Sequence, residues 1–343
     1  MSKILIVSSE QDAHARVVAW SLNRAGYEVE FWDTSFAIQK PGHSVHLSNG
    51  ANTRIQVAGN DSYKGAWLRR VFQTKKFSGE TCDADKDYVR GESSRYVDNV
   101  LERMSDAGTP WLNDKRAAIR GEYKFEQLEA CRKLGIRFPD TLISNDPVKV
   151  RAFAARFDRI VVKPIDVYTW RSEDGSQLMT YANTITSAQL SEMSDAQILA
   201  CPAIYQQAIN KVADVRAVIV GEAVFACRIE SPHPDIDFRP FQTDGTLSFT
   251  AVSDLDMNRD LSMLIDHFGL NMASTDFCID ADGERYFLDL NPGGAFLFVE
   301  FYGGGPIVSH VAAAIAGDED VTKFPGLAEY NAWATEENRI SGA

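Results

Sequence analysis

The sequence predicts an α/β protein that opens with a parallel sheet and ends in antiparallel hairpins. Residues 3–8 contain an apolar run typical of a buried strand, residues 12–24 have helical spacing, and residues 28–32 read as the next strand. This β-α-β order is typical of a parallel sheet. Near the other end of the chain, apolar and polar residues alternate on both sides of Asp282-Gly283, a dipeptide that favours a two-residue hairpin turn.

The same criteria place the remaining elements in order. Helical spacing predicts helices at 88–104, 124–133, 255–268 and 306–316, and a short helix that begins at Thr186 or Ser187. Apolar runs predict strands at 66–70, 159–163 and 203–207, and a hairpin over 214–229 that turns at Gly221-Glu222. Residues 74–87 and 166–178 are rich in polar side chains, so we expect loops there.

The composition is that of an ordinary soluble globular protein. The chain has 343 residues, 45% hydrophobic and 24% charged, which predicts roughly two or three domains. A formal net charge of −13 argues against general nucleic-acid binding. The five cysteines are widely spaced, which favours reduced thiols in the cytoplasm over a zinc site or disulfides. The N-terminal residues contain no apolar run long enough for a signal peptide or membrane span, so we expect no membrane partner.

The hairpin around Asp282-Gly283 carries a candidate metal site. Counting outward from a two-residue turn places Asp276 opposite Asp289, with Asn291 on the same face. Two opposed carboxylates repel unless a positive charge lies between them, and their oxygens suit Mg²⁺ with phosphate oxygens as further ligands. An ordinary exposed hairpin with solvated acids is the alternative. The residues expected on the opposite, core-facing side are Phe277, Ile279, Tyr286, Leu288 and Leu290.

Several blocks of sequence, taken in order, link this hairpin to the rest of the chain. They are residues 111–113, 124–147, 161–164, 206–216, 220–226, 289–294 and 298–300. Their order and spacing resemble the ATP-grasp superfamily, in particular its graspetide (microviridin-type) branch of peptide macrocyclases, over roughly residues 66–316. The resemblance implies an N-terminal pre-ATP-grasp α/β domain (1–113), a central lid subdomain (114–204) and a C-terminal subdomain with an antiparallel sheet and the metal site (205–343).

The resemblance implies that two lysines bind the phosphates of ATP. Lys163 ends a strand and is followed by Pro164, and Lys124 lies early in a helix. A lysine is a point charge that can follow phosphate oxygens during a reaction. The alternative is that both are solvated surface lysines.

The resemblance also assigns the adenosine part of ATP. Residues 203–209, which end in Ala208 and Ile209, resemble the hinge strand whose backbone reads the adenine edge, and Gln206 or Gln207 adds a side-chain contact. Asp214 resembles the acid that accepts hydrogen bonds from the ribose hydroxyls. The alternatives are a buried strand with a polar edge and a solvated aspartate at the start of a hairpin.

The metal ligands depart from the pattern of the family. ATP-grasp enzymes hold two Mg²⁺ ions with Asp, Glu and Asn, whereas this chain offers Asp276, Asp289 and Asn291, so we expect one or two ions. The Glu-to-Asp change shortens one ligand by a methylene group. Ser274 stands where amino-acid ligases often have Arg, and Ala295 where related macrocyclases often have Gln.

Three arginines are candidates for binding the transferred phosphoryl group and the reacting carboxylate, because a guanidinium fork matches both anions. In the hairpin that turns at Gly221-Glu222, Arg216 and Arg228 point to opposite faces, so only one of them reaches the cleft, and we favour Arg216. Arg239 lies on a connection that could fold over the phosphates, or form an ordinary loop ion pair.

The implied reaction is ATP-dependent joining of a carboxylate through an acyl phosphate. The leading hypothesis is a ligase that forms ester or amide cross-links from Asp or Glu to Ser, Thr or Lys in a precursor peptide made of leader and core. Residues 88–104 offer a leader-binding surface or simply a solvated helix face, and a homodimer is expected from the resemblance. The alternatives are a small-molecule carboxylate–amine ligase, a non-catalytic ATP-binding protein, and a kinase that stops after phosphoryl transfer.

Overall fold

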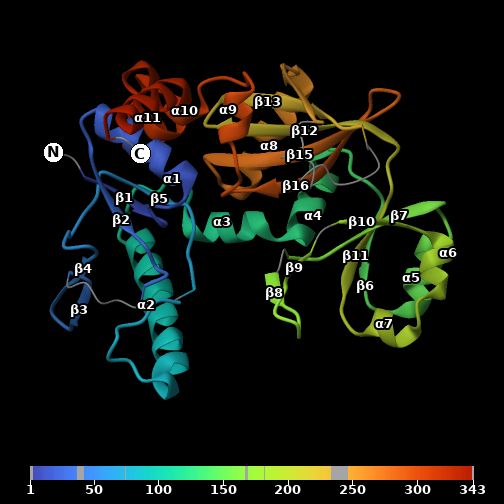
Figure 1. Cartoon of the computed structure of the whole chain (residues 1–343), viewed down its shortest axis with the longest axis horizontal. Coiled ribbons are helices and arrows are strands. Elements are labelled where there is room, and N and C mark those ends of the chain that lie inside the picture. The colour runs from blue at the N-terminus through green and yellow to red at the C-terminus, as the bar shows by residue number, and fades with distance from the viewer. Residues whose placement is uncertain are drawn as a thin grey trace.

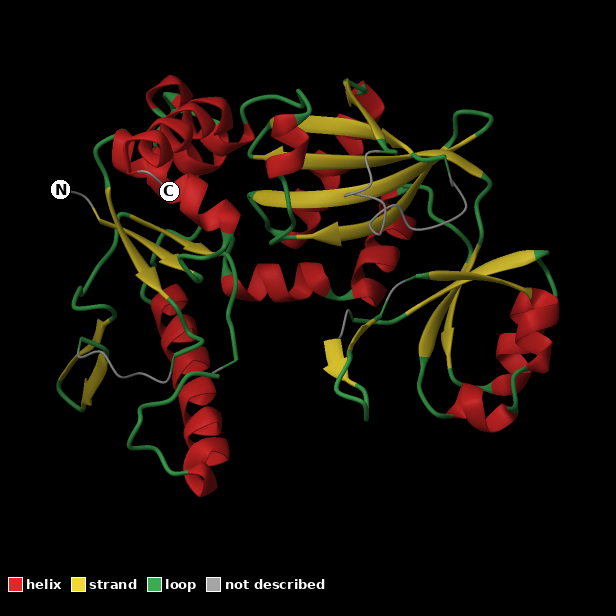
Figure 2. Cartoon of the chain, viewed as in Figure 1, coloured by secondary structure: helices red, strands yellow, loops and turns green. Residues whose placement is uncertain are grey.

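The computed structural model describes residues 3–36, 42–73, 75–166, 169–180, 182–232 and 246–341. Three sheets of three or more strands organise this part of the chain. Figures 1 and 2 show them in an N-terminal unit, a unit at the far end that we call the lid after its expected role, and a larger C-terminal unit. None of the described helices is both long and apolar enough to cross a membrane.

The N-terminal sheet is parallel, as predicted. Its strands are β1 (Lys3–Val7), β2 (Glu28–Trp32) and β5 (Gly65–Leu68), in the order β2-β1-β5. The Asp12 carboxylate accepts a hydrogen bond from the Ala15 amide and thereby begins helix α1 (Ala13–Arg24). The unit also contains the hairpin β3 (Ser44–Ser48) and β4 (Ala51–Gln56), the 3-10 turn η1 (Asp83–Asp85) and helix α2 (Lys86–Asp106).

The sheet of the unit that we call the lid comes from the middle of the chain. Its strand order is β10-β7-β11-β6, and helices cover one face of it. The predicted boundary at residue 204 falls inside β11, which is hydrogen-bonded to both β7 and β6, so the sheet continues to Gln207. Part of the predicted loop 166–178 forms a short hairpin, β8 (Thr169–Arg171) and β9 (Gln177–Met179). The other lid elements are β6 (Thr141–Ser144), α5 (Pro147–Ala154), β7 (Arg159–Lys163), β10 (Asn183–Thr186), α6 (Ser187–Glu192), α7 (Asp195–Leu199) and β11 (Ala203–Gln207).

The C-terminal sheet is antiparallel, with the strand order β14-β13-β12-β15-β16. Helices α3 (Lys115–Glu122), α4 (Lys124–Leu134) and α8 (Leu255–Phe268) pack beside it, and α4 and α8 cover one of its faces with apolar side chains. The predicted boundary at residue 114 had assigned α3 and α4 to the lid, whereas the structure packs them on the C-terminal unit. The strands are β12 (Lys211–Val220), β13 (Ala223–Glu230), β14 (Ser248–Val252), β15 (Met272–Asp280) and β16 (Arg285–Asn291).

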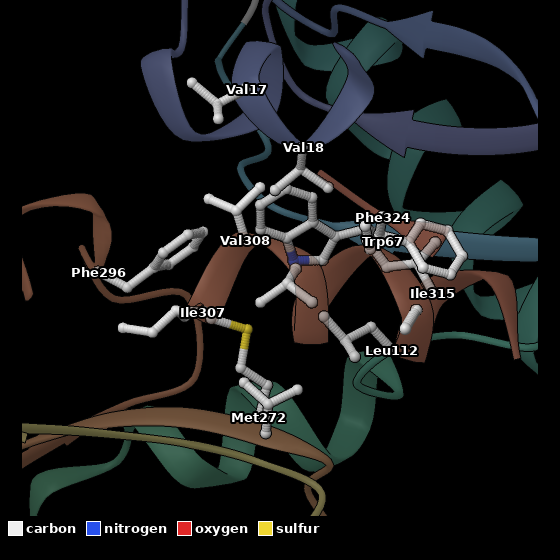
Figure 3. Close-up of a cluster of buried hydrophobic side chains, with 14 of the residues drawn as sticks. Val17, Val18, Trp67, Leu112, Met272, Phe296, Ile307, Val308, Ile315 and Phe324 are labelled. Carbon is white, nitrogen blue, oxygen red and sulfur yellow. The ribbon is translucent and has the colours of Figure 1, made fainter. Parts of the chain in front are cut away.

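The end of the chain returns to the N-terminal unit. Helix α9 (Leu297–Phe301) follows the C-terminal sheet, and α10 (Ile307–Ala316), the turn η3 (Val321–Lys323) and α11 (Leu327–Ser341) come next. Helix α10 packs against α1 and β5, and a β-carbon on Gly65 would lie 1.8 Å from the Ile315 carbonyl oxygen, so only glycine fits there. Figure 3 shows the resulting core, where Trp67 of the N-terminal unit meets Met272 and Phe296 of the C-terminal unit.

Candidate active site

A cavity of roughly 430 Å³ lies between the lid and the C-terminal sheet. Side chains alternate between the two faces of each lid strand, and this explains which of them line the cavity. In the lid, Ile160 and Tyr205 point to the helices, whereas their neighbours Val161 and Gln206 line the cavity. The cavity brings together all of the predicted site residues except two arginines: Lys124, Lys163, Gln206, Gln207, Ala208, Ile209, Asp214, Arg216, Asp276, Asp289 and Asn291.

The carboxylates of the metal hairpin lie opposite each other, as predicted. The register pairs Asp276 with Asp289 and Ser274 with Asn291. The turn itself differs from the prediction, because Asp280 donates its amide to the Glu284 carbonyl and leaves a three-residue loop that includes Gly283 at φ 83°.

A β-bulge in β16 compensates for the longer turn. The register shifts between Asp276 and Phe277, and the extra residue restores the predicted pairing beyond that point. Between the turn and the bulge, the side chains of β16 lie on the opposite face from the predicted one. The prediction that Tyr286 and Leu288 face the core is therefore wrong. Leu288 lines the cavity, and Tyr286 pairs with Cys278 on the cavity side, while Phe287 takes the core position.

The two acids are neutralised by two of the predicted cations. Lys124 forms an ion pair with Asp289, and Arg216 Nη1 lies 3.1 Å from Asp276 Oδ2. These contacts explain how a sheet tolerates two directly opposed carboxylates. Both cations line the cavity, and a guanidinium or an ammonium is a group that can bind a phosphate oxygen.

The donor set fits a magnesium ion. Mg²⁺ prefers carboxylate and other oxygen ligands, and Asp276, Asp289 and Asn291 provide two carboxylates and an amide oxygen on neighbouring strands. The Asn291 side-chain oxygen accepts a hydrogen bond from the Gly293 amide at 3.2 Å, which orients that oxygen. Across the described residues no group of three or more His, Cys, Asp and Glu is arranged for a metal.

Lys163 reaches across from the lid. Its Nζ donates a hydrogen bond to the Leu288 carbonyl at 3.2 Å, next to Asp289. This carbonyl belongs to the bulge in β16, so the lid lysine and the metal hairpin touch at one point. Because Lys124 pairs with Asp289, the two lysines contact adjacent residues of β16 in the cavity wall.

The predicted adenine and ribose residues also line the cavity. The Gln206 side chain is buried and donates to Thr141 Oγ1 at 2.9 Å, so its amide already bonds to the neighbouring strand of the lid. Gln207 lines the cavity as well. Lys211 Nζ donates to both Asp214 oxygens, at 2.7 and 2.6 Å. A carboxylate oxygen can accept more than one hydrogen bond.

The two remaining arginines are not part of the described cavity. Arg228 pairs with Val215, whose side chain enters the core beneath the sheet, and its guanidinium contacts Glu230 at 2.8 Å. The sheet therefore places it on the opposite face from Arg216, as strand alternation predicts, and the geometry offers it no contact with a ligand in the cavity. Arg239 lies outside the described residues.

Some residues that line the cavity were not predicted from the sequence. Glu122 lines the cavity beside Lys124, and Lys211 holds Asp214, a contact that the spacing Lys-x-x-Asp would have suggested. Cys278 also lines the wall. Burial raises the pKa of its thiol to about 12, and the charge of Asp214 adds to the effect, so the thiol is not a nucleophile at neutral pH.

Comparisons with solved structures support the fold. A RiPP-associated ATP-grasp ligase of Chryseobacterium gregarium, solved with ADP and a leader and core peptide, is 21% identical and matches 95% of this chain and 98% of its own with a TM-score of 0.80. The macrocyclase MdnC of Microcystis aeruginosa, bound with precursor peptide MdnA, is 21% identical and matches 92% of this chain and 100% of its own with a TM-score of 0.75.

Two further structures place the chain within this fold. The ATP-grasp ligase PsnB, complexed with a variant of its minimal precursor, Mg and ADP, is 22% identical over 92% of this chain and 98% of its own, with a TM-score of 0.70. D-cycloserine synthetase DcsG is 16% identical over 92% of this chain and 99% of its own, with a TM-score of 0.56. No protein-family model and no curated protein sequence matches the chain. The ATP-grasp fold expected from the sequence is confirmed.

Proposed function

We propose that this chain is an ATP-dependent carboxylate ligase that works through an acyl phosphate and modifies a precursor peptide. The observation that carries the proposal is the single cavity that unites lysines for phosphate, a strand edge for adenine and oxygen ligands for magnesium. A carboxylate oxyanion is a poor leaving group, and phosphorylation converts it into a good one.

In the first step, a carboxylate oxygen of the substrate attacks the γ-phosphorus of ATP, the bond to the bridging oxygen breaks, and ADP leaves. Lys124 and Lys163 bind the phosphates, and Arg216 neutralises negative charge on the phosphoryl group during its transfer. Asp276, Asp289 and Asn291 would hold magnesium, which when bound supplies positive charge at the phosphate oxygens.

In the second step, a hydroxyl or amine attacks the acyl carbon, loses its proton and expels phosphate. The product is an ester or an amide, and one water is lost overall. The residues of the cavity align the reactants and neutralise charge, without a covalent intermediate on the protein. The raised pKa of the Cys278 thiol is consistent with a reaction that uses no cysteine nucleophile.

The class of substrate is proposed from the solved structures. The more similar ones are described with a leader and core peptide or a precursor peptide, whereas DcsG, named for the synthesis of a small molecule, is less similar. We therefore place a precursor peptide first and a small-molecule carboxylate–amine ligase second. A homodimer and a leader-binding role for α2 (Lys86–Asp106) remain proposals.

The test is mass spectrometry of the purified protein with ATP, Mg²⁺ and each short peptide encoded beside its gene. Loss of one water per bond, with equimolar ADP, is the expected result. A stable gain of phosphate would indicate a kinase, and ADP release with free amino acids alone would indicate the small-molecule ligase. Nucleotide binding without any turnover would indicate a non-catalytic protein.

A further inference from the structure

The loop that joins β16 to α9 is held at two points by the N-terminal unit. His14 Nε2 accepts hydrogen bonds from the Phe296 amide at 3.1 Å and the Leu297 amide at 3.4 Å. At the other end of the loop, Arg69 Nη1 donates to the Gly293 carbonyl. Both contacts cross from one end of the chain to the other, so they connect the N-terminal unit to the unit that carries the candidate metal ligands.

The side chains that hold the loop are themselves fixed. Asp12 Oδ1 lies 3.5 Å from Arg69 Nε and 3.8 Å from His14 Nδ1, and the Arg69 side chain is 0% exposed. Because two backbone amides donate to Nε2, the ring proton of His14 is on Nδ1, facing Asp12. Burial lowers the pKa of His14 to about 4, and the positive charge of Arg69 adds to the effect, so the ring is neutral at pH 7 and able to accept.

The loop itself is closely packed against its neighbours. The His14 ring packs edge-on against Phe296 with centroids 4.8 Å apart, and Phe296 lies in the core drawn in Figure 3. A β-carbon on Gly294 would lie 2.5 Å from the Ser274 β-carbon, so the loop presses directly on β15. The Gly293 amide in turn donates to the Asn291 side chain.

We propose that His14 and Arg69 are positioning residues that set the magnesium affinity of the site by holding this loop and, through Gly293, the side-chain oxygen of Asn291. The inference rests on the proposed function. All three candidate metal ligands come from the C-terminal sheet, so this loop makes the N-terminal unit part of the metal site. Outer partners that orient a ligand typically change metal affinity by about tenfold or more when removed.

The test compares His14→Phe, which keeps the ring and its packing but removes the acceptor, with His14→Gln, whose amide oxygen can still accept. The matched control is His310→Phe. The His310 ring also packs against a phenylalanine, at 4.9 Å from Phe225, but its Nδ1 lies 2.9 Å from the Pro306 carbonyl oxygen in its own helix turn. Titration calorimetry gives the Mg²⁺ affinity at saturating ADP, and hydrogen exchange reports the Phe296 and Leu297 amides.

We expect His14→Phe to weaken Mg²⁺ binding about tenfold, to leave metal-free ADP binding unchanged and to speed exchange at both amides. His14→Gln should recover most of the loss, and His310→Phe should match the wild type. Arg69→Met against Arg69→Lys provides a second pair if His14→Phe does not fold.

Wild-type Mg²⁺ affinity in His14→Phe and Arg69→Met would overturn the inference and leave the proposed function standing. A wild-type protein that binds no Mg²⁺ with ADP would overturn both. The two failures are therefore distinguishable within one set of titrations.

Discussion

The ammonium group of Lys124 on α4 is paired with the carboxylate of Asp289 on β16. The first was expected to bind phosphate and the second to bind magnesium, so without ligands each neutralises the other. Phosphate binding to Lys124 alone would leave the charge of Asp289 uncompensated in the cavity wall. Magnesium binding to Asp289 alone would do the same to Lys124. We therefore expect ADP and Mg²⁺ to bind cooperatively.

Asp289→Asn tests this pair, because it keeps the shape of the side chain and removes the charge. We expect the Mg²⁺-dependent part of ADP binding and all ATP turnover to be lost, since an amide is a poor substitute for a carboxylate at a hard cation. Isothermal titration with and without Mg²⁺ measures the effect. Asp282→Asn, the same change in the turn of the same hairpin, should bind like the wild type. Unchanged Mg²⁺ affinity in Asp289→Asn would show that the metal binds elsewhere.

Lys163 should contribute to nucleotide affinity from the lid. Replacing it with methionine removes a charge-assisted contact worth about 1.5–3 kcal/mol, or roughly 10- to 100-fold in the dissociation constant of ATP. Lys149→Met is the matched control, since that lysine lies on the same lid with its side chain 70% exposed. Equal ATP affinities in the two variants would exclude Lys163 from the phosphate site.

The arginines of the β12–β13 hairpin form a natural pair for comparison. Arg216→Met should lower the rate of ADP formation by about 100-fold, because it removes a preorganised cation at the transferred group. Arg228→Met should leave the rate unchanged, since its guanidinium contacts Glu230 on the other face. Steady-state kinetics with saturating ATP separates them. A similar loss in both variants would contradict the assignment of faces.

His14 should make the stability of the fold sensitive to acid. Its pKa is lowered from 6.5 to about 4, chiefly by burial. The unfolded chain therefore takes up a proton near pH 6.5 and the folded chain only near pH 4. The free energy of unfolding is therefore not reduced by His14 above pH 6.5. As the pH drops toward 4, protonation of His14 in the unfolded chain lowers the free energy of unfolding by up to about 3 kcal/mol.

Urea unfolding near pH 7.5 and near pH 4.5 measures this loss. His14→Phe has no group to titrate at this position, so the difference between the two pH values should be smaller in the variant than in the wild type. His310→Phe should keep the wild-type difference. An equal loss in His14→Phe and wild type would mean that other groups cause the acid sensitivity.

Short-range patterns in the sequence predicted much of the site. Alternation in the β12–β13 hairpin correctly separated Arg216 from Arg228, because a two-residue turn leaves one possible register. The metal hairpin was harder. Its turn has one more residue than predicted, and the bulge at Leu288 adds one residue to the other strand, so Asp276 and Asp289 still meet while Tyr286 and Leu288 change faces.

Features that depend on tertiary packing could not be predicted. Helices α3 and α4 join the C-terminal core because their apolar sides fit β16 and α8, and no local pattern encodes that choice. The contact of His14 with the Phe296 amide joins residues 282 positions apart. Gln206 turns toward Thr141, a neighbour that only the paired strands β11 and β6 bring close.

We propose that one cavity holds nucleotide between two lysines and magnesium on the β15–β16 hairpin. A crystal structure with Mg²⁺ and a non-hydrolysable ATP analogue would show both ligands at once. We predict the ion on Asp276, Asp289 and Asn291, with Lys124 released from Asp289 and, together with Lys163, on the phosphates. A nucleotide bound outside this cavity, or an ion that none of these three side chains contacts, would contradict the account.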